Sequence, residues 1–408
     1  MADAWIIDGL RTPRGKGKPT GALHGVHPQE LLAQVLNGLA ERTGMDPAIV
    51  DDVIVGNGSQ TGDHANDIAR WSVLTAGWPV SVSGVALNRF CGSGQQAIMF
   101  AAMGIRSGWQ DVVVAGGVES MSRYDSAMRT PMGGANPRLR DAYPLVPQGV
   151  SADLIATREG FTRQDVDMFA VRSQERAAMA FANGYFEKSI HAVVDQSGTV
   201  LLDHDEHPRP GTTLDSLASL PPSFAEMGRQ PREGEDRSYD DMCREVYPDI
   251  ADIDHVHHAG NSSGVVDGAG AVLLASSEVA GAHGLSPRAR VRSCAVVGDE
   301  PVIMLTAPGP ASLACLKRAG MTTRDIDLWE INEAFAAVPM KTMRDLGIDE
   351  DKVNVNGGAI ALGHPIGATG PMLFQTLIDE LERRDLNTGL VAMCTGGGMA
   401  TATIIERI

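Results

Sequence analysis

One arrangement of predicted elements occurs in both halves of the chain: a strand, a glycine loop, a helix, and a second strand followed by glycines. The first copy consists of a strand at Val82–Asn88, the loop Cys91-Gly-Ser-Gly94, a helix at Gln95–Ser107, a strand at Asp111–Ala115, and Gly116-Gly117. The second copy consists of Val353–Asn356, the glycine loop Gly357–Gly367, a helix at Thr369–Arg383, a strand at Gly389–Cys394, and Gly396-Gly-Gly398. This repeat predicts a duplicated α/β core in which each copy contributes one loop.

The region between the two copies does not follow this order of strand, glycine loop, helix and strand. It contains one clear helical pattern, Thr162–Asn183, and an acidic stretch, Arg232–Asp241. We expect an insertion that returns to the core near His255–Gly270. The predicted division is residues 1–119 for the N-terminal core half, which returns at about 258–278, then 120–257 for an inserted loop domain and 279–408 for the C-terminal core half.

Composition narrows the functional classes. A formal net charge of −17 in 408 residues argues against a DNA or RNA binder that works by counterion release. The short basic run Arg11–Lys18 is therefore interpreted as a solvated loop. Five widely spaced cysteines without a CxxC pair indicate neither a disulfide framework nor a metal site. Acidic residues interrupt the apolar stretch in Met1–Arg11, and no apolar run of about 18 residues follows, so we expect a cytoplasmic protein without a membrane segment.

Cys91 lies where a predicted strand meets a helix, between glycines that leave backbone N–H groups free. That position favours a thiolate and indicates a nucleophile, although a small cysteine packed at a strand end is an equal alternative. The same loop satisfies G-x-G-x-x-A, with Glu119 downstream as the acidic residue of a dinucleotide-binding turn. An NAD-binding oxidoreductase is therefore a competing hypothesis.

Three further residues stand at comparable positions. His364 lies in Gly363-His-Pro-Ile-Gly367, where proline stiffens the loop as a general base requires, although a structural histidine in a turn is an equal alternative from this motif alone. Cys394 precedes Thr395-Gly-Gly-Gly398, whose amides can converge on an anion. Asn332 follows a predicted strand, Ile326–Ile331, and without the other motifs it is best explained as a helix N-cap. The histidines of His255-Val-His-His258 alternate along a predicted strand, so structural packing is favoured over a metal site.

Together these motifs resemble those of the thiolases, the acyl-CoA C-acyltransferases, over essentially the whole chain. The resemblance rests on Asn88-Arg-Phe-Cys-Gly-Ser-Gly94, Gly116-Gly-Val-Glu-Ser-Met121, Ala259-Gly-Asn-Ser-Ser-Gly-Val-Val-Asp-Gly268, Asn332-Glu-Ala-Phe335, Asn354–Gly367 and Cys394-Thr-Gly-Gly-Gly398. It implies a five-layer αβαβα core with an inserted loop domain, assembled as a homodimer or a dimer of dimers. It also implies coenzyme A as a substrate, with no permanently bound cofactor.

By this resemblance the chain cleaves a 3-oxoacyl-CoA with CoA by a ping-pong mechanism. Cys91 is then the acylated nucleophile, His364 its base, and Cys394 the acid/base for carbon and for the incoming thiol. Asn332, through a water, and His364 face one thioester oxyanion, while the N–H groups of Cys91 and Gly396 face the other. Ser263 corresponds to a pantetheine contact, and Met304 and Phe335 correspond to residues lining the thioester site.

Two departures from the family pattern concern the acyl group. Gln148 stands where members often have Met over the acyl pocket, and Met227–Asp254 adds an acidic stretch. We therefore predict a degradative thiolase that acts on fatty-acid or related acyl or steroid thioesters. The alternatives are a biosynthetic acetoacetyl-CoA thiolase and, more remotely, the oxidoreductase or a non-catalytic CoA-binding partner.

Overall fold

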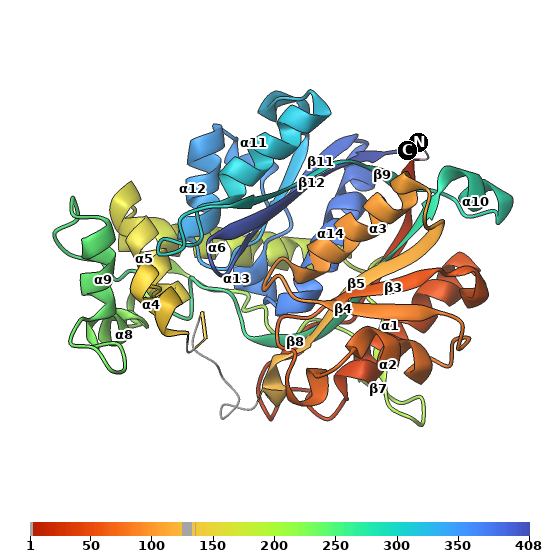
Figure 1. Cartoon of the computed structure of the whole chain (residues 1–408), viewed down its shortest axis with the longest axis horizontal. Coiled ribbons are helices and arrows are strands. Elements are labelled where there is room, and N and C mark those ends of the chain that lie inside the picture. The colour runs from red at the N-terminus through yellow and green to blue at the C-terminus, as the bar shows by residue number, and fades with distance from the viewer. Residues whose placement is uncertain (1–2, 125–132, 135) are drawn as a thin grey trace.

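The computed structural model describes residues 3–124, 133–134 and 136–408. Within them, a mixed sheet has the strand order β10-β11-β12-β9-β1-β8-β5-β3-β4, and β2 pairs with β8 (Figure 1). The strands are β1 (Ala4–Arg11), β2 (Gly15–Lys16), β3 (Asp52–Gly56), β4 (Ser83–Leu87), β5 (Val112–Ser120), β8 (Val266–Ser276), β9 (Ala289–Gly298), β10 (Leu328–Ile331), β11 (Thr388–Thr395) and β12 (Met399–Arg407).

The pairing pattern of the first half of this sheet is repeated in the second. In the first half β3 is parallel to β5, β5 is antiparallel to β8, and β8 is antiparallel to β1. In the second half β10 is parallel to β11, β11 is antiparallel to β12, and β12 is antiparallel to β9. A short β1–β9 pairing, Trp5 with Arg290 and Ile6 with Ala289, joins the halves. The predicted duplication is confirmed.

Helices cover both halves and also fill the space between them. The outer helices are α1 (Pro28–Thr43) and α2 (Ile68–Thr75) over the first half, and α11 (Pro308–Ala319) and α12 (Ala337–Leu346) over the second. Between the halves lie α3 (Ser93–Ser107) and α14 (Thr369–Arg384), which share one hydrophobic cluster with strands of both halves. The order is α, β, α, β, α, as expected.

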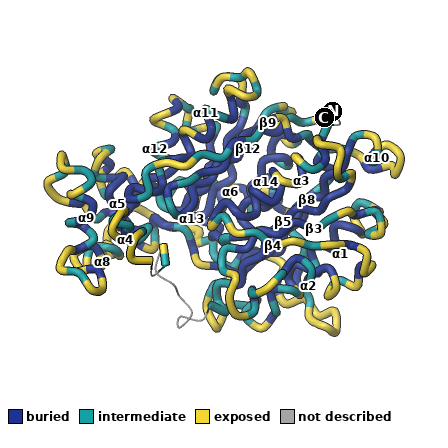
Figure 2. Tube along the Cα trace, viewed as in Figure 1, coloured by how far each residue is buried: buried dark blue, intermediate teal, exposed yellow. Residues whose placement is uncertain are grey.

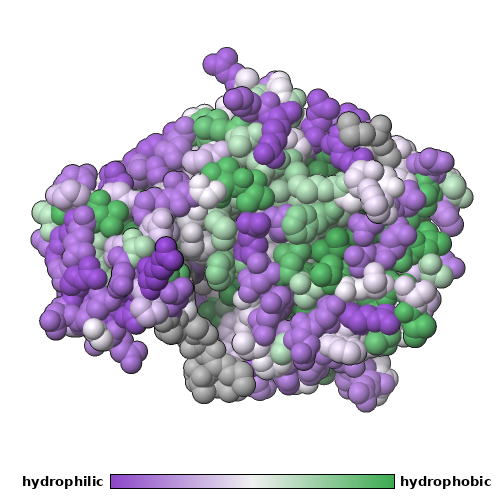
Figure 3. Space-filling view, in the orientation of Figure 1, coloured by the Kyte–Doolittle hydropathy of each residue, from purple (hydrophilic) through white to green (hydrophobic). Residues whose placement is uncertain are grey.

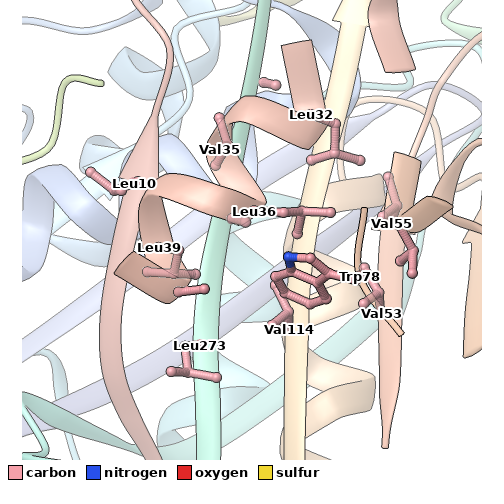
Figure 4. Packing of buried hydrophobic residues seen from close by; sticks show 14 of the residues in the cluster. Leu10, Leu32, Val35, Leu36, Leu39, Val53, Val55, Trp78, Val114 and Leu273 are labelled. Carbon is pink, nitrogen blue, oxygen red and sulfur yellow. The ribbon is translucent and has the colours of Figure 1, made fainter. Parts of the chain in front are cut away.

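The spacing of apolar residues along each helix and strand explains which layer the element packs against. Leu32, Leu36 and Leu39 fall on one face of α1 and pack on Val53 and Val114 (Figure 4). Strands β3 and β5 are buried on both faces, because alternate side chains reach the clusters on opposite sides of the sheet. Figure 2 shows this continuous burial of the strands and of α14.

The second copy departs from the expected strand at Val353–Asn356. Only Val353 makes a parallel bridge, to Trp329. The backbone of Asn354 is left-handed with a φ of 47°, and its side chain bonds the backbone of Ile331 instead. The counterpart of β4 is thus reduced to one bridge. Conversely, β5 continues through Gly116-Gly117 to Ser120, beyond its predicted end.

Glycines allow the two central helices to meet at their N-terminal ends. A Cβ atom on Gly94 would lie 2.3 Å from the carbonyl oxygen of Gly367, and one on Gly370 would lie 2.2 Å from the backbone nitrogen of Gln95. No other residue type permits this backbone approach. The contact brings the Cys91 loop of one copy against the His364 loop of the other.

Part of the segment between β5 and β8 forms the lobe on the left of Figure 1, and the same segment also crosses the middle of the molecule and reaches the lower right. Its helices are α4 (Pro137–Ala142), α5 (Gln148–Glu159), α6 (Arg163–Ala182), α7 (Leu214–Ala218), α8 (Ala225–Arg229) and α9 (Tyr239–Val246), and β6 (Val193–Val194) pairs with β7 (Val200–Leu202). The helix expected at Thr162–Asn183 is α6, which begins after a capping box formed by Thr162 and Asp165. Further short helices are α10 (Ser277–Ala282) and α13 (Ala359–Leu362).

A buried ion cluster ties this segment to β1. Arg11 Nη1 lies 2.7 Å from Asp205 Oδ1, and Arg14 Nη1 lies 3.3 Å from Asp205 Oδ2. Both arginines are buried, so the expectation of a solvated loop was wrong for them. The paired carboxylate, which is almost two hundred residues away in the chain, makes their burial tolerable.

Candidate active site

Three glycine loops meet above the junction of the two halves. Gly94 of the Cys91 loop lies against Gly367 of the His364 loop, and a Cβ atom on Gly92 would lie 2.7 Å from Cγ2 of Thr395, which follows Cys394. The side chains that the sequence singled out are hardly accessible: Cys91 and His364 are 6% exposed and Cys394 is 1% exposed. The duplicated fold therefore brings one loop of each copy and the β11 turn to one buried place.

Cys91 occupies a tight turn between β4 and α3. Phe90 has a φ of 49°, and the Ser93 hydroxyl closes the turn by donating to the Phe90 carbonyl at 2.6 Å. The backbone N–H groups of Cys91 and Gly396 act on the thiol in favour of its ionised form. Burial nevertheless raises the pKa of Cys91 to about 12. The expected thiolate was wrong, because burial outweighs the N–H groups and the thiol keeps its proton.

His364 provides a neutral base close to this thiol's loop. Burial, helped by the nearby Arg14 guanidinium, lowers the pKa of His364 to about 4. Its Nδ1 lies 2.5 Å from Thr369 Oγ1, and the Thr369 hydroxyl donates to the Pro365 carbonyl. This assigns the hydrogen to Nδ1, so Nε2 keeps its lone pair. The ring is held in the form that accepts a proton.

Asn332 is held beside this ring. Its Nδ2 lies 3.5 Å from His364 Nε2, while its backbone N–H donates to the Ala392 carbonyl at 3.0 Å. Its Oδ1 is buried and has no hydrogen-bond partner among the described residues. The N-cap alternative was wrong, because α12 begins at Ala337 with Ala336 as its N-cap. The amide oxygen is thus available to a water molecule or a substrate.

Cys394 ends β11 just before the glycine turn. Burial raises the pKa of Cys394, and the adjacent Cys91 raises it further. The turn depends on Gly397 and Gly398, whose φ angles of 77° and 74° disfavour other residues. The site therefore holds two protonated thiols close together, with one neutral imidazole.

The four residues predicted to contact substrate surround these groups. Ser263 adjoins the Asn332 segment, because its N–H donates to the Ala334 carbonyl at 2.9 Å. Phe335 stacks edge-on against Phe224 and His257. Met304 is fully buried in the same hydrophobic cluster as Cys394. Gln148 begins α5, and its Nε2 lies 3.3 Å from where a Cβ atom on Gly396 would stand.

Glu119 has a role that the sequence interpretation missed. Its buried carboxylate accepts hydrogen bonds from the N–H groups of Gly58 and Gly367 at 2.8 Å, from that of Ser59 at 3.1 Å, and from the Tyr124 hydroxyl at 2.7 Å. It thereby fastens the His364 loop to the loop after β3. A single acid at the end of an otherwise apolar strand was the available signal.

This network overturns the dinucleotide hypothesis. The carboxylate that would have bound a ribose already accepts hydrogen bonds from protein N–H groups. Gly94 lies against the Gly367 backbone, which leaves no space for a pyrophosphate. The glycines serve helix packing and not phosphate binding.

The three histidines at 255–258 lie in no strand, but their structural role was interpreted correctly. His255 Nδ1 and His257 Nδ1 both lie 2.7 Å from the Asp153 carboxylate, and His258 Nε2 lies 2.8 Å from Asp167 Oδ1. Among the described residues, no group of three or more His, Cys, Asp or Glu side chains is arranged to hold a metal ion.

A cavity of about 460 Å³ opens beside Ser263. Its charged lining consists of the basic side chains of Lys16, Lys18 and Arg209 and one acidic side chain, Glu206, so basic groups outnumber acidic ones. In a chain with a net charge of −17, this is a local concentration of positive charge. The cavity offers cations to an anionic ligand beside Ser263.

Comparison with known proteins decides the family. The thiolase N-terminal domain model matches residues 4–230 and the thiolase C-terminal domain model matches residues 285–407. This chain belongs to the thiolase family. It is an acyltransferase, and the predicted family is confirmed.

Curated relatives and solved structures span the whole thiolase chain. It is 42% identical to the steroid 3-ketoacyl-CoA thiolase FadA6 of Mycobacterium tuberculosis, over 100% of this chain and 95% of the relative. It is 40% identical to a beta-ketoadipyl-CoA thiolase of Escherichia coli, over 100% of both. The acetyl-CoA acetyltransferase of Bacillus anthracis has a similar structure, with a TM-score of 0.84, 36% identity, and coverage of 100% of this chain and 99% of that one.

A search of the helices for a membrane span had a negative result. Over the described residues, none combines the length and the apolar character needed to cross a bilayer.

Proposed function

We propose that this thiolase cleaves a 3-oxoacyl-CoA with CoA, releasing acetyl-CoA and an acyl-CoA two carbons shorter. The observation that carries the proposal is the environment of Cys91: a buried, protonated thiol whose loop lies against the loop of a buried, neutral His364, with the N–H groups of Cys91 and Gly396 acting on the sulfur. A buried thiol needs a base to become a nucleophile, and a neutral imidazole whose Nε2 carries no hydrogen is that base.

In the first half-reaction, His364 Nε2 takes the Cys91 proton while the sulfur attacks the 3-oxo carbon. The oxygen on that carbon becomes an oxyanion, and we assign the N–H groups of Cys91 and Gly396, which act on the sulfur, to stabilise it. The C2–C3 bond then breaks, the acyl group stays on Cys91, and the departing carbon takes a proton from the Cys394 thiol. Asn332, through a water, and His364 face the oxygen of the departing acetyl-CoA.

In the second half-reaction, a CoA thiol gives its proton to the Cys394 thiolate and attacks the acyl-cysteine. The Cys91 sulfur leaves and recovers its proton from His364, so every group returns to its starting state. Two thiols are required because one holds the acyl group while the other exchanges a proton. The complete set of Cys91, His364, Cys394 and Asn332 argues against a non-catalytic CoA-binding partner.

CoA fits the cavity beside Ser263. Its phosphates carry the negative charge that Lys16, Lys18 and Arg209 can pair with, and its pantetheine arm would pass Ser263 toward the thiols. CoA enters and leaves in each cycle, so we assign it as a substrate and assign no permanent cofactor.

The acyl group is proposed to be larger or more polar than acetoacetyl. Gln148 places an amide over the Gly396 turn, and curated relatives are named for steroid and beta-ketoadipyl substrates. We propose that the segment between β5 and β8 is a loop domain that supplies the acyl pocket walls. Degradation is the direction that these observations favour over acetoacetyl-CoA synthesis.

A homodimer is proposed through the free edge at β4, either alone or within a dimer of dimers. Val85 on β4 and Phe100 and Met103 on α3 are exposed, and Figure 3 shows apolar side chains gathered over these elements. An exposed edge strand beside an apolar patch is typically covered by a partner. The cytoplasmic location expected from the sequence stays a prediction.

Trapping of the acyl-enzyme tests the assignment. With acetoacetyl-CoA and no added CoA, intact mass spectrometry should detect one acetyl adduct per chain, because the second half-reaction lacks added acceptor. The adduct should persist in Cys294→Ala, a control on β9, and disappear in Cys91→Ala. An adduct that survives Cys91→Ala would refute the proposal.

A further inference from the structure

A loop of the C-terminal half, residues 299–305, connects the acidic insertion to the catalytic turn. It carries Met304, and its start is pressed on Gly398: the Asp299 N–H donates to the Gly398 carbonyl at 2.6 Å, and a Cβ atom on Gly398 would lie 2.7 Å from the Asp299 carbonyl oxygen. Any shift of this loop therefore moves a wall beside the Cys394 turn.

Glu300 organises this loop from within. Its carboxylate accepts the N–H of Val302 at 2.9 Å and that of Ile303 at 3.0 Å, and its carbonyl accepts the Met304 N–H at 3.1 Å. Met304 is fully buried and has a φ of 59°. A non-glycine residue keeps such a strained backbone only where contacts with the surrounding structure hold it in that conformation. The hydrogen bonds that Glu300 accepts from this loop help to hold Met304 in that conformation.

Tyr247 brings the insertion into this arrangement. It directly follows α9, and its hydroxyl donates to Glu300 Oε2 at 2.6 Å. Burial and the carboxylate both raise the pKa of Tyr247, so the hydroxyl remains a donor. The Arg158 guanidinium lies 4.3 Å from the centre of its ring. Arg158 belongs to α5, the helix that begins with Gln148. Tyr247 therefore contacts both proposed walls of the acyl pocket: α5 through Arg158, and the Met304 loop through Glu300.

Hydrophobic packing supports the same connection. Met242 and Cys243 of α9 are fully buried in one cluster with Val302, Met304 and Cys394. Ser151 of α5 donates to the Val302 carbonyl at 2.7 Å. The insertion is thus packed directly on the loop that bears Met304.

We propose that Tyr247 is a positioning residue for acyl specificity: through Glu300 it holds the Met304 loop against the catalytic turn and so makes the acidic insertion a determinant of which acyl group is accepted. The inference rests on the proposed function, because it takes Met304 and Gln148 as pocket walls. Cys91, His364 and Asn332 are held by other contacts and do not depend on Tyr247.

Tyr247→Phe tests this by removing only the hydroxyl. The measurement is the ratio of kcat/KM for thiolysis of 3-oxooctanoyl-CoA to that of acetoacetyl-CoA. We expect the ratio to change by about threefold or more, because even one methylene can be discriminated tenfold or more by a shaped pocket. Acetylation of Cys91 by acetyl-CoA should stay within about twofold of the unmodified enzyme, since the reacting groups are untouched.

Tyr239→Phe is the matched control. Tyr239 begins the same helix and packs on the same cluster, and no hydrogen bond from its hydroxyl is found among the described residues. Its ratio should not change. Glu300→Gln should alter the ratio by itself, and Tyr247→Phe should then add little, because the two residues act as one unit.

A ratio measured on one preparation is independent of the active fraction, so partial unfolding cannot imitate the effect. An unchanged ratio in Tyr247→Phe and in Glu300→Gln, or an equal change in Tyr239→Phe, would overturn the inference while leaving the proposed function intact. Absence of Cys91 acylation in the unmodified protein would instead overturn the proposed function.

Discussion

Replacing Glu119 by glutamine tests whether a buried carboxylate aligns the reacting loops. Oε2 accepts from the N–H groups of Gly58 and Gly367, and Oε1 accepts from the Ser59 N–H, the Tyr124 hydroxyl and, at 3.4 Å, the Asn57 side-chain amide. A glutamine keeps one accepting oxygen. It fits best with its NH₂ on the Oε1 side, where the tyrosine hydroxyl can turn to accept and the Ser59 N–H loses its partner.

The expected loss of stability follows from the number of hydrogen bonds that the glutamine cannot replace. The partly buried Ser59 N–H left without an acceptor costs about 1–3 kcal/mol, whereas the Asn57 amide keeps its bond to the Val118 carbonyl. Weaker neutral bonds elsewhere are offset because a charge is no longer buried. At about 2.1 cal/mol/K per residue, the unfolding entropy of the chain is about 0.9 kcal/mol/K, so Tm should fall by about 1–4 °C. The effect on the rate of Cys91 acylation should be larger than the small fall in Tm suggests. A displacement of a fraction of an ångström at the His364 loop slows acylation by about tenfold or more.

The assay pairs a thermal melt with single-turnover acetylation of Cys91, and Glu278→Gln on the exposed side of α10 is the matched control. The control should match the unmodified protein in both measurements. If Glu119→Gln acetylated Cys91 at the unmodified rate, the alignment role would be refuted whatever happened to Tm.

Three further predictions address other parts of the structure. Cys394→Ala should slow cleavage of acetoacetyl-CoA far more than acyl-enzyme formation from acetyl-CoA, measured by stopped flow; equal losses would mean that this thiol only shapes the site. Gly370→Ala should lower the unfolding free energy by at least about 1–3 kcal/mol in denaturant melts, because its Cβ would lie 2.2 Å from the Gln95 nitrogen, whereas Gly281→Ala in open space should not. Burial lowers the pKa of His255, but its hydrogen bonds to two aspartates outweigh this and raise it to about 9, above the unfolded value of 6.5. Its stabilisation should therefore be complete below pH 6.5 and lost as the pH rises through about 9, and a slope that persisted in His255→Gln would contradict this.

Local patterns in the sequence were enough to predict the framework and the reacting groups. Helix and strand periods, capping residues and glycine loops depend on neighbours within a few residues, so α6 and the strands around Cys91 and Cys394 lie close to where they were expected. The repeated unit predicted the duplicated core because each copy must bury the same faces. Where local conformation departs from the pattern, as at Asn354 with its left-handed backbone, the expected strand was wrong.

Tertiary structure alone decided the electrostatic state of the site and its supports. The pKa of Cys91 depends on how completely other elements exclude water, which outweighs the helix N-terminus that the sequence displays. The partners of Arg11, Glu119 and Tyr247 lie on remote segments or in another element: Asp205, the N–H of Gly367, and the Glu300 carboxylate. No local period encodes such pairs, because a buried polar group is stabilised by whichever partner the fold brings within hydrogen-bonding distance. The sequence by itself determined which residues are proposed to react, and the packing of distant segments determined their protonation, their alignment and the proposed walls of the acyl pocket.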